Sequence, residues 1–307
     1  MLAALSGGVA VTGPAWPAEG PGTLAVVYPD IGEPFRTVFT SILEGIREQA
    51  RQPVPGYPLG ADAGTAALVD ELKRRDTRVV IALGRSGLKL AAAMDRGVGV
   101  VVGCVLAVPE ALAQAYPVHS LAPDPALIFA ELRRQMPAAR RVFVVHDPQQ
   151  NAWLIRLAQE AAKAQGLELS AYEADDLKRA TRAYQEIVAV AEPRRDALWL
   201  PQDSTTVEES TLLPLVLEEA WRRGFATISS NALHVKRGAL FALYPDNPAL
   251  GRSLALSALE ALAGRRVLRG LQPLRDVLVA ANLRTAAHLG IDLDPRARRI
   301  AKVYPES

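Results

Sequence analysis

Short apolar runs alternate with amphipathic segments along most of this 307-residue chain. Residues 24–28 form the first apolar run, and residues 35–46 then repeat apolar side chains at intervals of three and four. A continuous apolar run is typical of a parallel strand covered on both faces, and the second spacing is typical of a helix with one buried side. The alternation predicts an α/β protein whose parallel sheets carry helices on both faces.

The same rhythm continues toward the C-terminus. We expect further strands at 79–83, 98–106, 142–146, 167–172, 197–200, 226–229 and 277–281. We expect helices at 88–94, 152–165, 179–190, 212–223 and 247–264. Asp124 followed by Pro125 indicates one more helix start, because Asp is a favoured N-cap and Pro suits the first helical position.

The length favours two lobes, since a single domain usually takes about 150 residues. Irregular stretches at 107–124 and 232–246 interrupt the rhythm, and we interpret them as passages of the chain from one lobe to the other. Three crossings are expected, near 118–123, 232–238 and 268–275. The predicted N-terminal lobe is 21–120 plus 236–270, and the predicted C-terminal lobe is 121–235 plus 271–307.

Charge and cysteine usage exclude several classes of protein. Lys and Arg together number 35 against 33 Asp and Glu, and we find no basic stripe, so we expect no nucleic-acid partner. Cys104 is the one cysteine and lies in a strand-like run, which favours a buried structural thiol. The four histidines lack the spacing of a metal site, and we expect no metal and no cofactor.

The first 18 residues are apolar, rich in small side chains and free of Lys and Arg. They resemble the hydrophobic part of a secretory signal without its basic leader. We therefore expect residues 1–20 to be a signal-like segment of a periplasmic protein; the alternative is a loose terminal tail.

Two segments resemble a known family. Residues 236–246 (KRGALFALYPD) precede Leu250-Gly251-Arg252, and residues 279–286 (VAANLRTA) precede Leu289-Gly290-Ile291. This order is similar to that of ABC-transporter substrate-binding proteins of the TrpX-like type, over roughly residues 197–291. The resemblance implies a type I periplasmic-binding-protein fold: two Rossmann-like lobes, three crossovers and a ligand between the lobes. Caps and turns explain the matched residues themselves, so they identify the family and not the site.

The binding site is expected where strands end. In open parallel sheets, ligands collect at the carboxyl ends of strands, beside free N–H groups of helix N-termini. Gly84, Arg85 and Ser86 would hold a carboxylate. The resemblance implies that Asp203 holds an ammonium group, because the family places a similar acidic residue after the matching strand; the alternative for Asp203 and Ser204 is a helix cap. The full set of candidate ligand contacts is Tyr28, Asp30, Gly84, Arg85, Ser86, His146, Asp147, Gln202, Asp203, Ser204 and Asn231.

The sequence thus predicts a solute-binding component of an ABC importer that closes on a small polar ligand, an amino acid or related carboxylate. We expect a monomer without enzymatic activity, and the resemblance implies an ABC permease and its ATPase as partners. No Gly-x-Ser-x-Gly elbow, P-loop or dinucleotide fingerprint is present. Two alternatives remain at this point: an α/β enzyme of similar two-lobe architecture, and a ligand-sensing domain.

Overall fold

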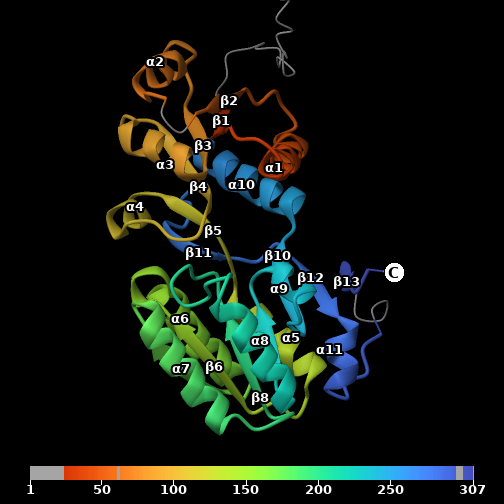
Figure 1. Cartoon of the computed structure of the whole chain (residues 1–307). Coiled ribbons are helices and arrows are strands. Elements are labelled where there is room, and N and C mark those ends of the chain that lie inside the picture. The colour runs from red at the N-terminus through yellow and green to blue at the C-terminus, as the bar shows by residue number, and fades with distance from the viewer. Residues whose placement is uncertain (1–23, 61–62, 295–299, 307) are drawn as a thin grey trace, which may run out of the picture.

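The computed structural model describes residues 24–60, 63–294 and 300–306, which form two lobes, each around one sheet (Figure 1). The six-stranded sheet has the order β11-β5-β4-β3-β1-β2, and the seven-stranded sheet the order β13-β12-β10-β9-β8-β6-β7. Both sheets are parallel except where β12 runs antiparallel to β10. The α/β class and the two-lobe type I architecture predicted from the sequence are confirmed.

The N-terminal lobe holds the six-stranded sheet and the helices packed on it. Its strands are β1 (Leu24–Pro29), β2 (Gly56–Leu59), β3 (Val79–Leu83), β4 (Gly99–Val105), β5 (Pro117–Pro123) and β11 (Gly270–Leu274). Its helices are α1 (Phe35–Ala50), α2 (Ala66–Arg74), α3 (Gly84–Ala93), α4 (Glu110–Ala115) and α10 (Asn247–Leu262).

Strand β3 shows why its sequence is apolar throughout. Val79, Ile81 and Leu83 lie in the core beneath α1 and α10, whereas Val80 and Ala82 lie in the core that includes residues of α2 and α3. All five side chains are buried, because successive residues of a strand point to opposite faces and both faces are covered.

Two glycines let α1 and α10 pack backbone against backbone. A Cβ atom placed on Gly251 would lie 2.1 Å from the carbonyl oxygen of Ile42, and one on Gly45 would lie 2.1 Å from that of Pro248. No side chain fits at either position.

The C-terminal lobe holds the seven-stranded sheet. Its strands are β6 (Arg141–His146), β7 (Glu168–Glu173), β8 (Asp196–Leu200), β9 (Ala226–Ser229), β10 (Phe241–Pro245), β12 (Val277–Asn282) and β13 (Lys302–Tyr304). Its helices are α5 (Pro125–Gln135), α6 (Pro148–Ala164), α7 (Leu177–Val190), α8 (Leu212–Arg223), α9 (Ala232–Lys236) and α11 (Leu283–His288). Trp199 is fully buried in this core and meets Phe129 edge to face, with ring centroids 5.7 Å apart.

The chain passes between the sheets three times, after β5, after β10 and between β11 and β12. Hydrogen bonds tie these passages together: Asp124 N donates to Leu274 O over 2.8 Å, and Asp246 N donates to Asp276 O over 2.9 Å. An ion pair of 2.9 Å joins Arg275 to Asp124. The three passages therefore form one connected hinge.

The second crossing differs from the sequence-based position at 232–238. Gly238 has the positive φ of +126° that a bend requires, but α9 and β10 both stay in the C-terminal lobe, where β10 pairs with β9 and β12. The chain crosses only at Asp246, which caps α10 by accepting a hydrogen bond from Ala249 N. We therefore propose moving the later boundary of the N-terminal lobe from 236–270 to 246–274.

Several strands escaped prediction because they contain proline. β5 begins with Pro117 and ends with Pro123, while Pro58 and Pro273 lie in the edge strands β2 and β11. Proline lacks an N–H group, so it is tolerated at strand ends and sheet edges, where no ladder hydrogen bond is lost. Sequence reasoning took such stretches for irregular chain.

Two sequence-based expectations, and one further finding, concern the rest of the molecule. The signal-like segment 1–20 lies outside the described residues. Among the residues described, no helix has the length and apolar character needed to cross a membrane. Burial raises the pKa of the Cys104 thiol to about 12, which keeps it uncharged as expected of a structural cysteine.

Candidate functional site

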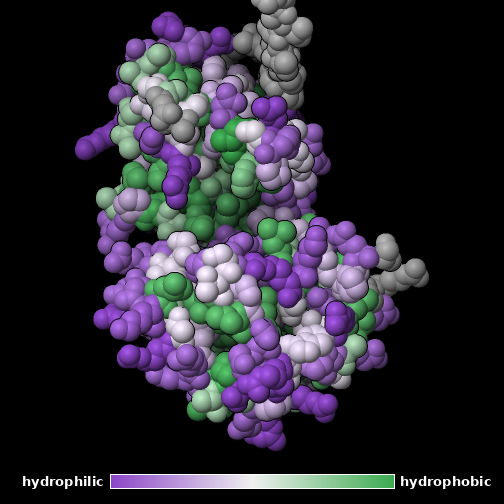
Figure 2. Space-filling model, in the orientation of Figure 1, coloured by the Kyte–Doolittle hydropathy of each residue, from purple (hydrophilic) through white to green (hydrophobic). Residues whose placement is uncertain are grey.

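The carboxyl ends of the strands in the two sheets face each other. β5 leaves the first sheet at its carboxyl end to enter the C-terminal lobe, and it runs parallel to β4, which is parallel to β3 and, through β3, to β1. β10 likewise leaves the second sheet at its carboxyl end, and it runs parallel to β9, β8 and β6 in turn. The loops after these strands therefore border the space between the lobes, where a hollow is visible in Figure 2.

The wall contributed by the N-terminal lobe is largely apolar. Figure 2 shows hydrophobic surface on the upper side of the hollow. Four large apolar side chains are exposed in the loops and helix that follow β1 and β4; they are Ile31, Phe35, Val38 and Leu106. Phe35 keeps 60% of its surface exposed, which costs free energy in water unless a ligand or the other lobe covers it.

The start of α3 offers unused hydrogen-bond donors in the same wall. Gly84 has a φ of +65° and lies so close to Pro29 that an added Cβ atom would be 2.9 Å from its Cγ. No side chain caps α3, so its first N–H groups stay free. The Ser86 side chain is buried and makes no hydrogen bond among the described residues, and the exposed Arg85 has no ion pair there. This geometry suits a carboxylate.

Tyr28 and Asp30 differ in where they lie. The Tyr28 ring lies over Gly56 of β2 and packs against the core beneath α1, and burial raises the pKa of its hydroxyl. Asp30 is exposed just after β1, and its carboxylate makes no hydrogen bond or ion pair among the described residues. Of these two candidates, Asp30 has the free side chain.

In the wall contributed by the C-terminal lobe, the polar side chains hydrogen-bond to one another and to neighbouring loops, and Asp203 is at the centre of this network. One carboxylate oxygen of Asp203 accepts hydrogen bonds from Thr205 N and Thr206 N, over 3.0 and 2.8 Å. The other accepts from Asp147 N over 2.7 Å and from Asn151 Nδ2 over 2.9 Å. The side chain thus caps its own loop, as the alternative interpretation had it, and also fastens that loop to the loop after β6.

Asp147 and Ser204 belong to the same network. Asp147 caps α6 by accepting from Gln149 N over 2.9 Å, and its second oxygen accepts from Gln150 Nε2 and Thr205 Oγ1. Ser204 Oγ donates to Gln150 Oε1 over 3.1 Å. The hydrogen bonds to Asp147 hold the pKa of its carboxyl below the usual value, against the effect of burial, so the group is ionised at neutral pH.

The remaining candidates lie at the ends of β6, β8 and β9. His146 is buried, its Nδ1 atom has no hydrogen-bond partner, and burial lowers its pKa. Gln202 Nε2 donates to Ser230 O over 2.9 Å. Asn231 caps α9 by accepting from Leu233 N. Gln202 and Asn231 are thus held by the protein itself, whereas His146 is held by burial alone.

The structure brings together the C-terminal candidates Asp147, Asp203 and Ser204, and it joins to them residues that sequence reasoning missed. Asn151, Gln150 and Thr205 connect the two loops. Their polar character beside a capped helix start was a usable signal. The exposure of Phe35 and Val38 had no such signal, because both belong to the apolar spacing that predicts the buried side of a helix at 35–46. Within the described ranges, no group of three or more His, Cys, Asp or Glu side chains is arranged to hold a metal ion.

No family model matches the sequence, and no curated protein matches it. Solved structures share its fold. A substrate-binding protein with adhesive properties from Clostridium difficile, in its ligand-free, open form, is 14% identical, with a TM-score of 0.67 over 93% of this chain and 100% of that one. An ABC domain from Streptococcus pneumonia in complex with L-Trp is 12% identical, with a TM-score of 0.56 over 92% and 99%. The chain therefore has the type I periplasmic-binding fold.

Proposed function

We propose that this chain is the extracytoplasmic solute-binding component of an ABC importer and that it closes its lobes around a small ligand. The observation that carries the proposal is the pair of facing strand-end walls. One wall has unused donors and exposed apolar side chains, and the other is rigidly bonded. A ligand touching both walls would favour the closed form over the open one, because it gains contacts only there.

The ligand we propose is an amino acid or a related carboxylate. Its carboxylate would accept hydrogen bonds at the start of α3, with Ser86 Oγ and the Arg85 guanidinium as donors. Its apolar part would cover Phe35 and its neighbours on the same wall. An ammonium group would find Asp30 available, whereas both oxygens of Asp203 already have protein donors. We therefore assign Asp203 to the support of the site.

The partners and location follow from this role. The closed form would dock on an ABC permease driven by its ATPase, and the protein would act as a periplasmic monomer. The shared fold and the apolar segment at 1–18 support this placement. The role is binding and not catalysis.

Calorimetry against a panel of amino acids, small carboxylates and neutral sugars tests the proposal, with mass spectrometry of any co-purified molecule. We expect binding of a carboxylate together with a smaller radius of gyration in solution scattering. Binding without compaction would contradict closure, and tight binding of an uncharged sugar would contradict the ligand class. Turnover of the bound compound would favour the enzyme alternative.

A further inference from the structure

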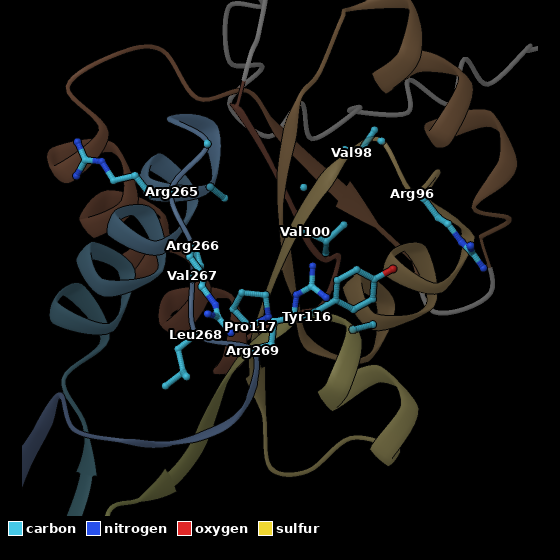
Figure 3. A pocket seen from close by; sticks show the side chains of 15 residues that line it. Arg96, Val98, Val100, Tyr116, Pro117, Arg265, Arg266, Val267, Leu268 and Arg269 are labelled. Atoms are coloured by element: carbon cyan, nitrogen blue, oxygen red, sulfur yellow. The ribbon is translucent and has the colours of Figure 1, made fainter.

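A second hollow lies at the opposite edge of the N-terminal lobe from the interlobe space. It has a volume of about 770 Å³ and is lined by 15 residues from the start of β4, the turn between α4 and β5, and the segment between α10 and β11 (Figure 3). Gly99 is the first residue of β4 and pairs with Val79, which pairs with Leu24 at the start of β1. The hollow therefore opens at the amino ends of the strands, away from the candidate ligand contacts.

Four of the lining residues are arginines and none is acidic. The arginines are Arg96, Arg265, Arg266 and Arg269. All four are exposed, and none of them makes an ion pair or a hydrogen bond through its side chain among the described residues. The acidic neighbour of Arg96 in sequence, Asp95, is paired with Lys73 over 2.8 Å. Like charges gathered without counter-charges raise the free energy of the folded chain, and a bound anion would relieve that cost.

The floor of the hollow is apolar and fixed. Val98, Val100 and Pro117 line it together with Tyr116, whose hydroxyl donates to Ala91 O over 3.0 Å and so holds the ring in place. In Figure 3, Arg266 and Arg269 lie beside Pro117 and Tyr116, with Arg96 on the far side of the ring, while Arg265 points away. The anchored ring and two nearby guanidinium groups form a cradle with a dry base and a cationic rim.

We propose that this arginine pocket binds a phosphate-bearing molecule, independently of the ligand between the lobes. A guanidinium group matches a phosphate because its N–H groups form a planar fork that donates two parallel hydrogen bonds. Two or three such forks around one hollow fit a group with two or more negative charges better than a single carboxylate. Leu268, which is 71% exposed between Arg266 and Arg269, gives the rim an apolar contact as well.

The phosphate has two chemical sources, a soluble phosphate ester or the headgroup of an anionic lipid. The exposed Leu268 beside arginines suits a membrane surface, where apolar side chains enter the headgroup layer and cations meet the phosphates. The concave apolar floor suits a soluble ester with a ring. Both sources share the recognition chemistry, so one set of variants serves to test them.

The experiment measures binding of inorganic pyrophosphate by calorimetry and binding of phosphatidylglycerol vesicles by sedimentation, using the full chain. R266Q/R269Q is compared with R140Q/R156Q, which removes the same charge from exposed arginines of the C-terminal lobe. We expect R266Q/R269Q to weaken binding at least about tenfold, and the control to change it less than about twofold. Binding should also weaken as salt rises.

The possible results distinguish the two sources of phosphate from each other and include those that would overturn the proposal. Pyrophosphate binding that depends on Arg266 and Arg269 supports a soluble ester. Vesicle binding that depends on them, falls with L268S and is absent with phosphatidylcholine supports a lipid headgroup. If wild type binds neither probe, or if R140Q/R156Q loses as much binding as R266Q/R269Q, the proposal is overturned. Because the pocket lies apart from the interlobe walls, R266Q/R269Q should still bind the ligand between the lobes. If wild type binds no ligand between the lobes, that result contradicts the proposed function and leaves the arginine pocket untouched.

Discussion

The two sides of the interlobe space are built in opposite ways. At the strand ends of the C-terminal lobe, Asp203 and Asp147 bind neighbouring loops through hydrogen bonds that leave few polar atoms unused. At the strand ends of the N-terminal lobe, Ser86, Arg85 and Asp30 have no side-chain partner among the described residues, and Phe35 is exposed.

This difference separates stability from binding. A polar group whose partners are all within the protein stabilises the fold and has little left to offer a ligand. A polar group without partners contributes little to stability and is available for recognition. Substitutions on the C-terminal side should therefore affect folding first, and those on the N-terminal side should affect binding first. The following predictions test this contrast, beginning with the largest expected effect.

Replacing Asp203 with alanine should lower the free energy of unfolding by about 3 kcal/mol, because buried donors from two loops lose their charged acceptor. Chemical denaturation measures the loss, and hydrogen exchange should show faster exchange at Asp147 and Thr206. Asp30→Ala is the matched control on the other wall and should change stability by less than about 0.5 kcal/mol. Equal effects of the two substitutions would remove the contrast.

Gly251→Ala should destabilise the N-terminal lobe by about 2 kcal/mol or more, since the new methyl group meets the backbone of α1 at Ile42 and not a flexible side chain. Gly32→Ala, where an added Cβ atom meets nothing within 4 Å, serves as its control. Thermal unfolding compares the two. An unchanged melting temperature in Gly251→Ala would show that α1 and α10 separate easily.

Ser86→Ala should leave stability within about 0.5 kcal/mol of wild type but weaken binding of the proposed carboxylate ligand about ten- to hundredfold, the usual worth of a hydrogen bond to a charged group. Calorimetry measures the affinity. Thr205→Ser, on the opposite wall, keeps the hydroxyl and should change affinity little. A Ser86→Ala variant that binds as wild type does would place the carboxylate elsewhere.

Acidification should destabilise the protein. Burial lowers the pKa values of His146, His234 and His119 in the folded state, so below the unfolded pKa of about 6.5 the unfolded chain binds more protons. Stability is therefore fully present above that pH and is lost as the pH falls toward 5. Two of these histidines lie in the C-terminal lobe, His146 at the end of β6 and His234 in α9, so H146Q/H234Q should flatten the pH dependence more than H119Q. Denaturation midpoints between pH 7.5 and 5 measure the difference, and a midpoint that rises on acidification would contradict it.

Much of the fold could be predicted from local sequence. Asp124 with Pro125 lies at the helix start that capping chemistry predicted, and α10 begins at Asn247, where the helix at 247–264 was expected. Strand Val79–Leu83 and helix Leu212–Arg223 have the predicted bounds. A helix cap depends on residues that are neighbours in the sequence, so it can be predicted without the fold. A strand covered on both faces is apolar throughout, so its sequence alone reveals it.

The use of each polar side chain was decided only by the tertiary structure. Asp203 lies in the loop after β8 and Ser86 in the first turn of α3 directly after β3, and the sequence assigned both to the ligand. Their surroundings differ because the loop after β6 and the first turn of α6 supply donors to Asp203, while the buried Ser86 side chain has no hydrogen-bond partner among the described residues. Likewise, the sequence predicted a crossing near 232–238, but the pairing of β10 with β9 and β12 decided that the chain crosses between the lobes only at Asp246. Contacts between residues far apart in the chain fix such outcomes, and local periodicity carries no record of them.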